Sequence, residues 1–131
     1  MIYIAWYQLT SMVSDLAEKF RAVDGGLRLV VRFASTDWEL EYIREDLEST
    51  YSAEDFEETY REHMASQVSA ENMSEVIVGG DFAGKMFMFE DIVVFQFPSS
   101  RYEGLFVSYD WRDSFPTNDV FRAADSLPEH E

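Results

Sequence analysis

The stretch that decides the fold is VIVGGDFAGKMFMFEDIVVFQF, residues 76–97. Its first half has the spacing of a phosphate-binding loop at Gly79, Gly84 and Lys85, with four residues between the two glycines and an apolar run before them. In a nucleotide-binding loop of this kind a helix would follow, and its N-terminus would bind the phosphate. Residues 86–97 are instead rich in Phe, Met, Ile and Val, which is typical of strands. The glycine segment is therefore predicted to connect two strands.

Two side chains in the same stretch also argue against a phosphate site. The position after Lys85, where a phosphate loop has Ser or Thr to bind Mg²⁺, is Met86. Asp81 adds a negative charge to a loop whose backbone amides would have to bind phosphate. We therefore interpret the glycines as turn residues chosen for positive φ.

Helical and strand patterns alternate along the rest of the chain. Ser52 followed by Asp55 has the form of a helix N-cap with acids in the first turn. The predicted elements are a helix over 8–23, strands over 27–34 and 38–42, a turn around 44–47, a helix from 53 that fades over 69–74, strands over 75–78, 85–90, 92–97 and 105–109, and a short helix from 117 or 118 to 124.

These elements predict one α+β domain over residues 1–131, with a frayed tail at 128–131. We expect a single antiparallel sheet of five to six strands with about three helices, in the order α-β-β-α-β-β-β-(β)-α. The first and last helices should cover one face, with the acidic helix from Ala53 more peripheral. In the first hairpin, alternation predicts that Arg28 and Arg32 lie on a solvent face, near the glutamates of the neighbouring strand.

The charge balance limits the partners. There are 26 Asp and Glu against 10 Lys and Arg, giving a net charge of −16. This field repels nucleic acid and anionic membranes, so neither is an expected partner. Only two of the ten basic residues are lysines, which is typical of proteins adapted to concentrated salt, where self-repulsion is screened. The alternative is an acidic protein from an ordinary environment.

The chain has no cysteine, which excludes disulfides, iron–sulfur clusters, thiol nucleophiles and Cys-ligated zinc. The opening MIYIAWYQL, residues 1–9, is apolar but has no positive n-region or cleavage site, and it is too short to span a bilayer. We therefore expect a cytoplasmic protein. Residues 1–9 could extend the first helix, add an edge strand or dock on a partner.

Acidic residues are concentrated between residues 37 and 62, a span that contains eleven acids and only two arginines. No calcium-loop pattern or Glu-x-x-His motif occurs there, and the row of Glu54, Glu58 and Glu62 on one helix face is typical of a solvated surface. We expect no metal, no cofactor and no catalytic residue. His63 is a weak candidate: it is either a core histidine or, through its near-neutral pKa, a functional group.

Aromatic side chains offer the other candidate site. They would pack in the core, line a small-molecule pocket or form a dimer face. The candidate residues for an interface or pocket are Phe87, Phe89, Phe95, Phe97, Trp38 and Tyr42.

Two resemblances follow from these residues. The run from Tyr42 to Leu47, followed by Tyr51 and Ser52, together with the later run from Val107 to Asp110, resembles a group of small acidic proteins from halophilic archaea with no established activity. The likeness covers about residues 28–111. Separately, the element order is similar to roadblock and longin domains and to profilin-like folds. That resemblance implies an interaction module that dimerises, and its GAF and PAS relatives imply a ligand on the sheet face.

The sequence therefore favours a non-enzymatic protein–protein interaction module, and the expected partner is a second copy or another protein. The main alternative is a sensor that binds a small apolar or cationic ligand between the sheet and the first helix. An enzyme is the least favoured class, because no nucleophile, base and oxyanion donor converge in the pattern.

Overall fold

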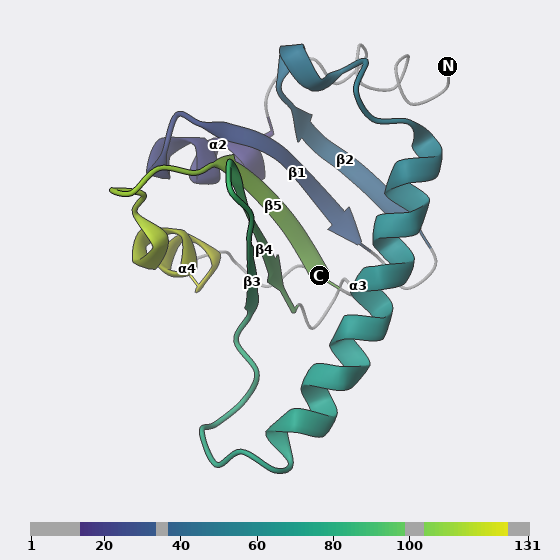
Figure 1. The fold of residues 1–131 in the computed structure, drawn as a ribbon, viewed down its shortest axis with the longest axis vertical. Coiled ribbons are helices and arrows are strands. Elements are labelled where there is room, and N and C mark those ends of the chain that lie inside the picture. Colours follow the sequence, from purple (N-terminus) through teal and green to yellow (C-terminus); the bar gives the residue numbers. More distant parts are fainter. Residues whose placement is uncertain (1–13, 34–36, 99–103, 126–131) are drawn as a thin grey trace.

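The computed structural model of the protein describes residues 14–33, 37–98 and 104–125 (Figure 1). The apolar segment 1–9, the first part of the predicted first helix and the tail 128–131 lie outside the described residues. The elements in chain order are α2 (Asp15–Val23), β1 (Leu27–Phe33), β2 (Trp38–Ile43), the 3₁₀ helix η1 (Glu45–Leu47), α3 (Ala53–Ser74), β3 (Lys85–Met88), β4 (Ile92–Phe97), β5 (Gly104–Asp110) and α4 (Thr117–Asp125).

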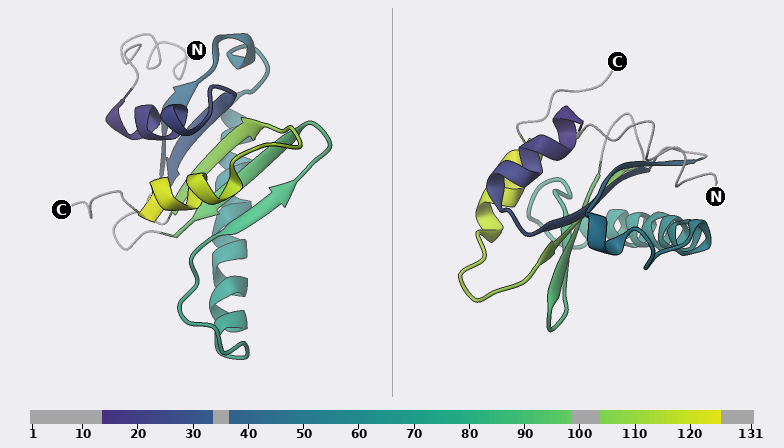
Figure 2. Two further views of the ribbon diagram at one scale, coloured as in Figure 1. Left: turned by 90° about the vertical axis from the view of Figure 1, so that its left-hand side faces the viewer. Right: turned by 90° about the horizontal axis from the view of Figure 1, so that it is seen from above.

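The strands form one antiparallel sheet in the order β2-β1-β5-β4-β3, which confirms the predicted fold class with five strands. The hairpin of β1 and β2 and the meander from β3 to β5 meet where β5 pairs with β1. Strands β2 and β3 are therefore the two edges of the sheet. Helices α2 and α4 cover one face, and α3 lies against the other (Figure 2).

Each face of the sheet has its own core. On the α2 and α4 side, Phe20, Phe95 and Tyr109 are fully buried together with Val120 of α4. On the α3 side, Phe33, Leu40 and Phe56 form the second core. The sheet is therefore sandwiched between helices, and both faces of its central strands read as apolar.

A bulge in β1 overturns the predicted one-sided alternation of the first hairpin. The register between β1 and β5 shifts between Leu27 and Leu29, so that Leu27 and Val30 join the α2 and α4 core while Leu29 joins the α3 core. The prediction that Arg28 lies on a solvent face is wrong, because its side chain is buried under α3. Alternation shows which residues share a face, but it does not show whether a helix covers that face.

The glutamates that were predicted to lie near Arg32 do so. Its guanidinium Nη2 lies 2.6 Å from Glu41 Oε2 and its Nη1 lies 3.8 Å from Glu39 Oε1. The cross-strand pairing of Arg32 with the glutamates of β2 is therefore confirmed.

Helix α3 begins as predicted but ends later. The Ser52 side chain accepts a hydrogen bond from Asp55 N, and the Asp55 side chain accepts one from Ser52 N, so a complete capping box starts the helix. The helix continues through the stretch that was predicted to fade and ends at Ser74. Its C-terminal half extends beyond the sheet (Figure 1), so only its first half covers the second face.

The predicted strand over 75–78 is wrong. Val76 N and Ile77 N both donate to the carbonyl of Met73, which turns the chain at the helix end, and the side chains of Val76 to Val78 are exposed. An apolar run this short has no intrinsic preference for a strand without a partner strand beside it. In the sheet, β3 is already the edge, and it pairs only with β4.

Candidate functional site

The structure separates the six candidate aromatic residues into different environments. Phe95 and Phe97 are buried core residues whose rings stack at 6.0 Å. Trp38 and Tyr42 are half-buried and belong to the two opposite cores. Phe87 and Phe89 are exposed, so only these two remain available for an interface.

The weak candidate His63 is a core residue. Its side chain is 1% exposed, and its ring lies 4.8 Å from the ring of Phe33. The imidazole also lies directly against the backbone of Gly104, because a Cβ built there would be 2.1 Å from Nε2. His63 therefore acts in packing α3 against the end of β5.

A buried arginine makes a polar network that the sequence did not reveal. Arg28 Nη1 donates to Ser108 Oγ at 3.0 Å, and Nη2 donates to Tyr51 Oη at 3.2 Å. Arg28 Nε lies 3.7 Å from Asp110 Oδ1. These contacts tie β1 to β5 and to the segment that enters α3, and they satisfy the buried guanidinium.

Arg44 extends this network. Its Nε donates to Asp46 Oδ1 at 2.7 Å and its Nη1 donates to Asp110 Oδ2 at 2.6 Å. The hydrogen bond to Asp46, and to a smaller extent the one to Asp110, raises the pKa of Arg44 above its ordinary value. Five residues from the runs 42–47, 51–52 and 107–110, which carry the resemblance to the small acidic proteins, take part in this network: Arg44, Asp46, Tyr51, Ser108 and Asp110.

A cavity of about 100 Å³ lies beside the network, lined by Arg28, Phe56, Val94 and Phe106 among others. Small-molecule sites commonly enclose roughly 300–1,000 Å³. This space is too small for such a ligand, so the network is a structural feature.

Exposed apolar side chains are confined to one stretch of the described chain, from the last turns of α3 to the hairpin that follows β3. Every large hydrophobic residue that is exposed in the described part of the chain lies between Val68 and Phe89. We call these residues the apolar end: Val68, Met73, Val76, Ile77, Val78, Phe87, Met88 and Phe89. They come from the last turns of α3, the following loop and the edge strand β3.

The apolar end is also poor in charge. Residues 68–89 contain three acids and one lysine, a net charge of −2, whereas residues 37–62 alone carry −9 and the whole chain −16. Exposed apolar surface marks interaction or ligand sites in many soluble domains.

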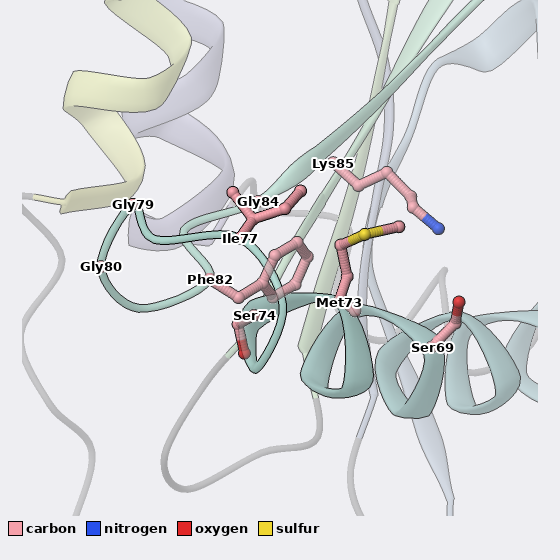
Figure 3. A pocket seen from close by; sticks show the side chains of 10 residues that line it. Ser69, Met73, Ser74, Ile77, Gly79, Gly80, Phe82, Gly84 and Lys85 are labelled. Carbon is pink, nitrogen blue, oxygen red and sulfur yellow. The ribbon is translucent and has the colours of Figure 1, made fainter.

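A cavity of about 300 Å³ shares Met73 and Ile77 with the apolar end and lies between the last turns of α3 and the loop that leads to β3 (Figure 3). Its lining residues are Ser69, Ala70, Met73, Ser74, Ile77, Gly79, Gly80, Phe82, Gly84 and Lys85. The segment that resembles a phosphate loop therefore forms one wall of this cavity.

The loop itself runs into strand β3 and not into a helix, as predicted. The prediction that its glycines have positive φ is correct for Gly80 and wrong for Gly79 and Gly84. At Gly84 the reason for glycine is space: a Cβ there would lie 3.0 Å from ring atoms of Phe97 and Phe121. The absence of a helix after the loop removes the anion site of a nucleotide-binding loop.

The space between the sheet and α2, which the sequence suggested for a ligand, contains core side chains. Phe20 and Ala17 of α2 are fully buried there, and the ring of Phe20 stacks on that of Phe97 at 6.3 Å. Packing rather than a ligand is favoured at this position. Among the described residues, no group of three or more His, Cys, Asp or Glu is arranged to hold a metal ion. No helix in the described ranges is both long enough and apolar enough to cross a membrane.

The fold and the apolar end define a small α+β domain with a helix-covered antiparallel sheet and one exposed apolar edge. The chain belongs to the family described as a domain of unknown function, DUF7522, whose model matches residues 14–129. No curated protein and no solved structure matches the chain.

Proposed function

We propose that the domain is a non-enzymatic protein–protein interaction module that forms a homodimer through the apolar end. The observation that carries the proposal is the concentration of all exposed large hydrophobic side chains of the described residues in a stretch whose net charge is only −2. Burying a Met or Phe side chain contributes about 1.5–3 kcal/mol relative to leaving it in water. Several such side chains are available here.

The edge strand supports a particular geometry. Strand β3 pairs with β4 on one side only, so its other side presents unpaired backbone N–H and C=O groups. Met88 and Phe89, at the end of this strand, are 53% and 56% exposed. Antiparallel pairing of β3 with β3 of a second copy would continue the sheet and bury these side chains in a two-fold interface.

The charge distribution favours dimerisation through strand β3 rather than through strand β2. Two chains of −16 repel each other over most of their surfaces, and the repulsion is smallest where residues 68–89 face each other. Strand β2, the other edge, carries Glu39 and Glu41 and lies next to the acidic span 37–62. Charged residues on an edge strand are a common protection against pairing.

The remaining parts of the proposal rest on the composition. The excess of acids with only two lysines favours a protein that works in concentrated salt, in the cytoplasm. Such salt screens charge pairing but leaves hydrophobic burial intact or stronger, so an apolar contact suits these conditions. The likeness of the element order to roadblock and longin domains, which dimerise, supports the same class.

Sedimentation at several KCl concentrations tests the dimer. We expect dimers whose proportion increases up to about 1 M KCl, where the Debye length falls to about 3 Å. Met88→Glu should give monomers, because it would place a charged carboxylate in the apolar interface. Ala22→Glu adds the same charge to an exposed position of α2 and should remain dimeric. A strict monomer at every salt concentration, or equal dimerisation of both variants, would overturn the proposal.

A further inference from the structure

The 300 Å³ cavity beside the apolar end has the size and lining of a small-molecule site. It lies at the lower end of the roughly 300–1,000 Å³ that such sites occupy. Met73 of α3, Ile77 of the turn and Phe82 of the following loop all line it (Figure 3). Three separate segments therefore supply one apolar wall.

Two residues that line the cavity are packed against the rest of the domain. Ala70, on the helix side, is buried. Gly84 is held tightly against the rings of Phe97 and Phe121, which connects the loop end of the cavity to the main core. The cavity is thus attached to the packed domain at both of its ends.

Lys85 lines the cavity, and its ammonium lies at the rim, directed away from Ile77 and Phe82 (Figure 3). Each arginine in the described residues is within ion-pair distance of a carboxylate. Lys85 differs: within the described part of the chain its ammonium donates to the Ser66 hydroxyl and lies 5.5 Å from the centre of the Phe87 ring, and it makes no ion pair. Among the described residues, Lys85 is therefore a half-buried cation without a carboxylate within ion-pair distance.

The charges of the lining residues also indicate which ligand charge the cavity would accept. It contains Lys85 and two serines but no Asp or Glu, so a cationic ligand would find no counter-ion there. A neutral apolar ligand would fill the cavity while leaving the ammonium without an anion. A carboxylate can accept charge-assisted hydrogen bonds from the ammonium, which are about twice as strong as neutral ones.

We propose that this cavity binds a small apolar carboxylic acid, with its hydrocarbon part against Met73, Ile77 and Phe82 and its carboxylate on Lys85. This inference goes beyond the proposed dimer and does not depend on it, because the cavity is formed within one chain. The same binding should therefore occur in the monomeric Met88→Glu variant.

Titration with octanoate, octanol and octylamine, three probes with the same chain length, tests the proposal by calorimetry and amide chemical shifts. We expect octanoate to bind about tenfold more tightly than octanol, in line with one charge-assisted contact, and octylamine to bind least. Amide shifts should be largest at Ser69, Gly80 and Lys85.

Three variants identify the site. Lys85→Met should remove the preference for octanoate over octanol while octanol still binds. Ala70→Phe should fill the cavity and abolish binding of both probes, with the far-ultraviolet circular dichroism spectrum showing that α3 is retained. Lys19→Met, which removes the only other lysine, should bind octanoate as the wild type does.

Several results would overturn the inference. These are equal affinity for octanoate and octylamine, an unchanged preference in Lys85→Met, and no detectable binding of octanoate at about 10 mM, which is weaker than any useful site. Binding that is lost in Met88→Glu but kept in the wild type would place the ligand at the dimer interface and not in this cavity. Loss of the dimer without loss of octanoate binding would refute only the proposed function.

Discussion

Replacing Gly104 with alanine should destabilise the fold through His63. A Cβ at Gly104 would lie 2.1 Å from Nε2 and 2.3 Å from Cε1 of the imidazole, and 2.9 Å from the carbonyl oxygen of Phe97. Ordinary contacts of a Cβ atom begin near 3.4 Å, so the ring would have to move by more than 1 Å. His63 is 1% exposed and packs on Phe33, which leaves it little room to move.

The size of the effect follows from this crowding. Adding a methyl group to a packed core costs about 1–3 kcal/mol. We expect Gly104→Ala to lower the free energy of unfolding by about 3 kcal/mol, at the upper end, since a side chain and a backbone oxygen are both too close and Gly104 has a φ of +156°, which alanine rarely adopts. At about 4 °C per kcal/mol for a domain of this size, the melting temperature should fall by about 12 °C.

Urea unfolding followed by tryptophan fluorescence and circular dichroism measures this change. Gly25→Ala is the matched control, because a Cβ there has no atom within 4 Å and Gly25 has no positive φ, so its stability should stay within about 0.5 kcal/mol of the wild type.

A double-mutant cycle with His63→Ala separates the two clashes. If the imidazole causes most of the crowding, the penalty of Gly104→Ala should fall by at least about 1 kcal/mol when His63 is alanine, leaving the part caused by Phe97 and by the positive φ of Gly104. Wild-type stability in Gly104→Ala, or the same penalty in both backgrounds, would refute the reasoning.

Three further predictions concern stability. Burial alone would raise the pKa of Asp24, but the hydrogen bonds that its carboxylate accepts from Arg112 and Gly26 outweigh burial and hold the pKa below 3.8. The stability that Asp24 supplies should be complete above pH 3.8 and be lost as the pH falls through the lower pKa of the folded state. Asp24→Asn should remove this part of the acid titration followed by circular dichroism. Tyr109→Phe should cost about 1–3 kcal/mol in urea unfolding, because it removes the donor to the buried carbonyl of Phe20; a neutral effect would mean that water replaces the hydroxyl. The melting temperature should rise between dilute buffer and about 1 M KCl as the repulsion among carboxylates is screened, and a fall in calorimetry would contradict the salt-adapted interpretation.

Local patterns in the sequence were sufficient for the order of the elements. The capping box at Ser52 set the start of α3, and the Phe- and Met-rich residues after Lys85 excluded the helix that a phosphate loop needs. These features depend on neighbours along the chain, within three or four residues, and so they could be predicted without knowing the fold.

What covers each face of the sheet could not be predicted in this way. Phe87 and Phe95 occur in similar strand patterns, yet Phe95 is fully buried and Phe87 is exposed, because β4 is an internal strand under α2 and α4 whereas β3 is the edge. Arg28 was expected in solvent and lies under α3. Strand alternation assigns residues to a face, and only the packing of distant elements decides which face meets water.

The sequence by itself determined the fold class, the excess of negative charge and the exclusion of a nucleotide site, since composition and short-range spacing control these properties. Only the tertiary structure decided the bulge in β1, the network around Arg28, the apolar end and the cavity at Lys85. Each of those features joins residues far apart in the chain, such as Arg28 and Ser108, whose contact depends on strand register and on helix placement. Such long-range geometry is fixed when the whole core packs, and no local pattern encodes it.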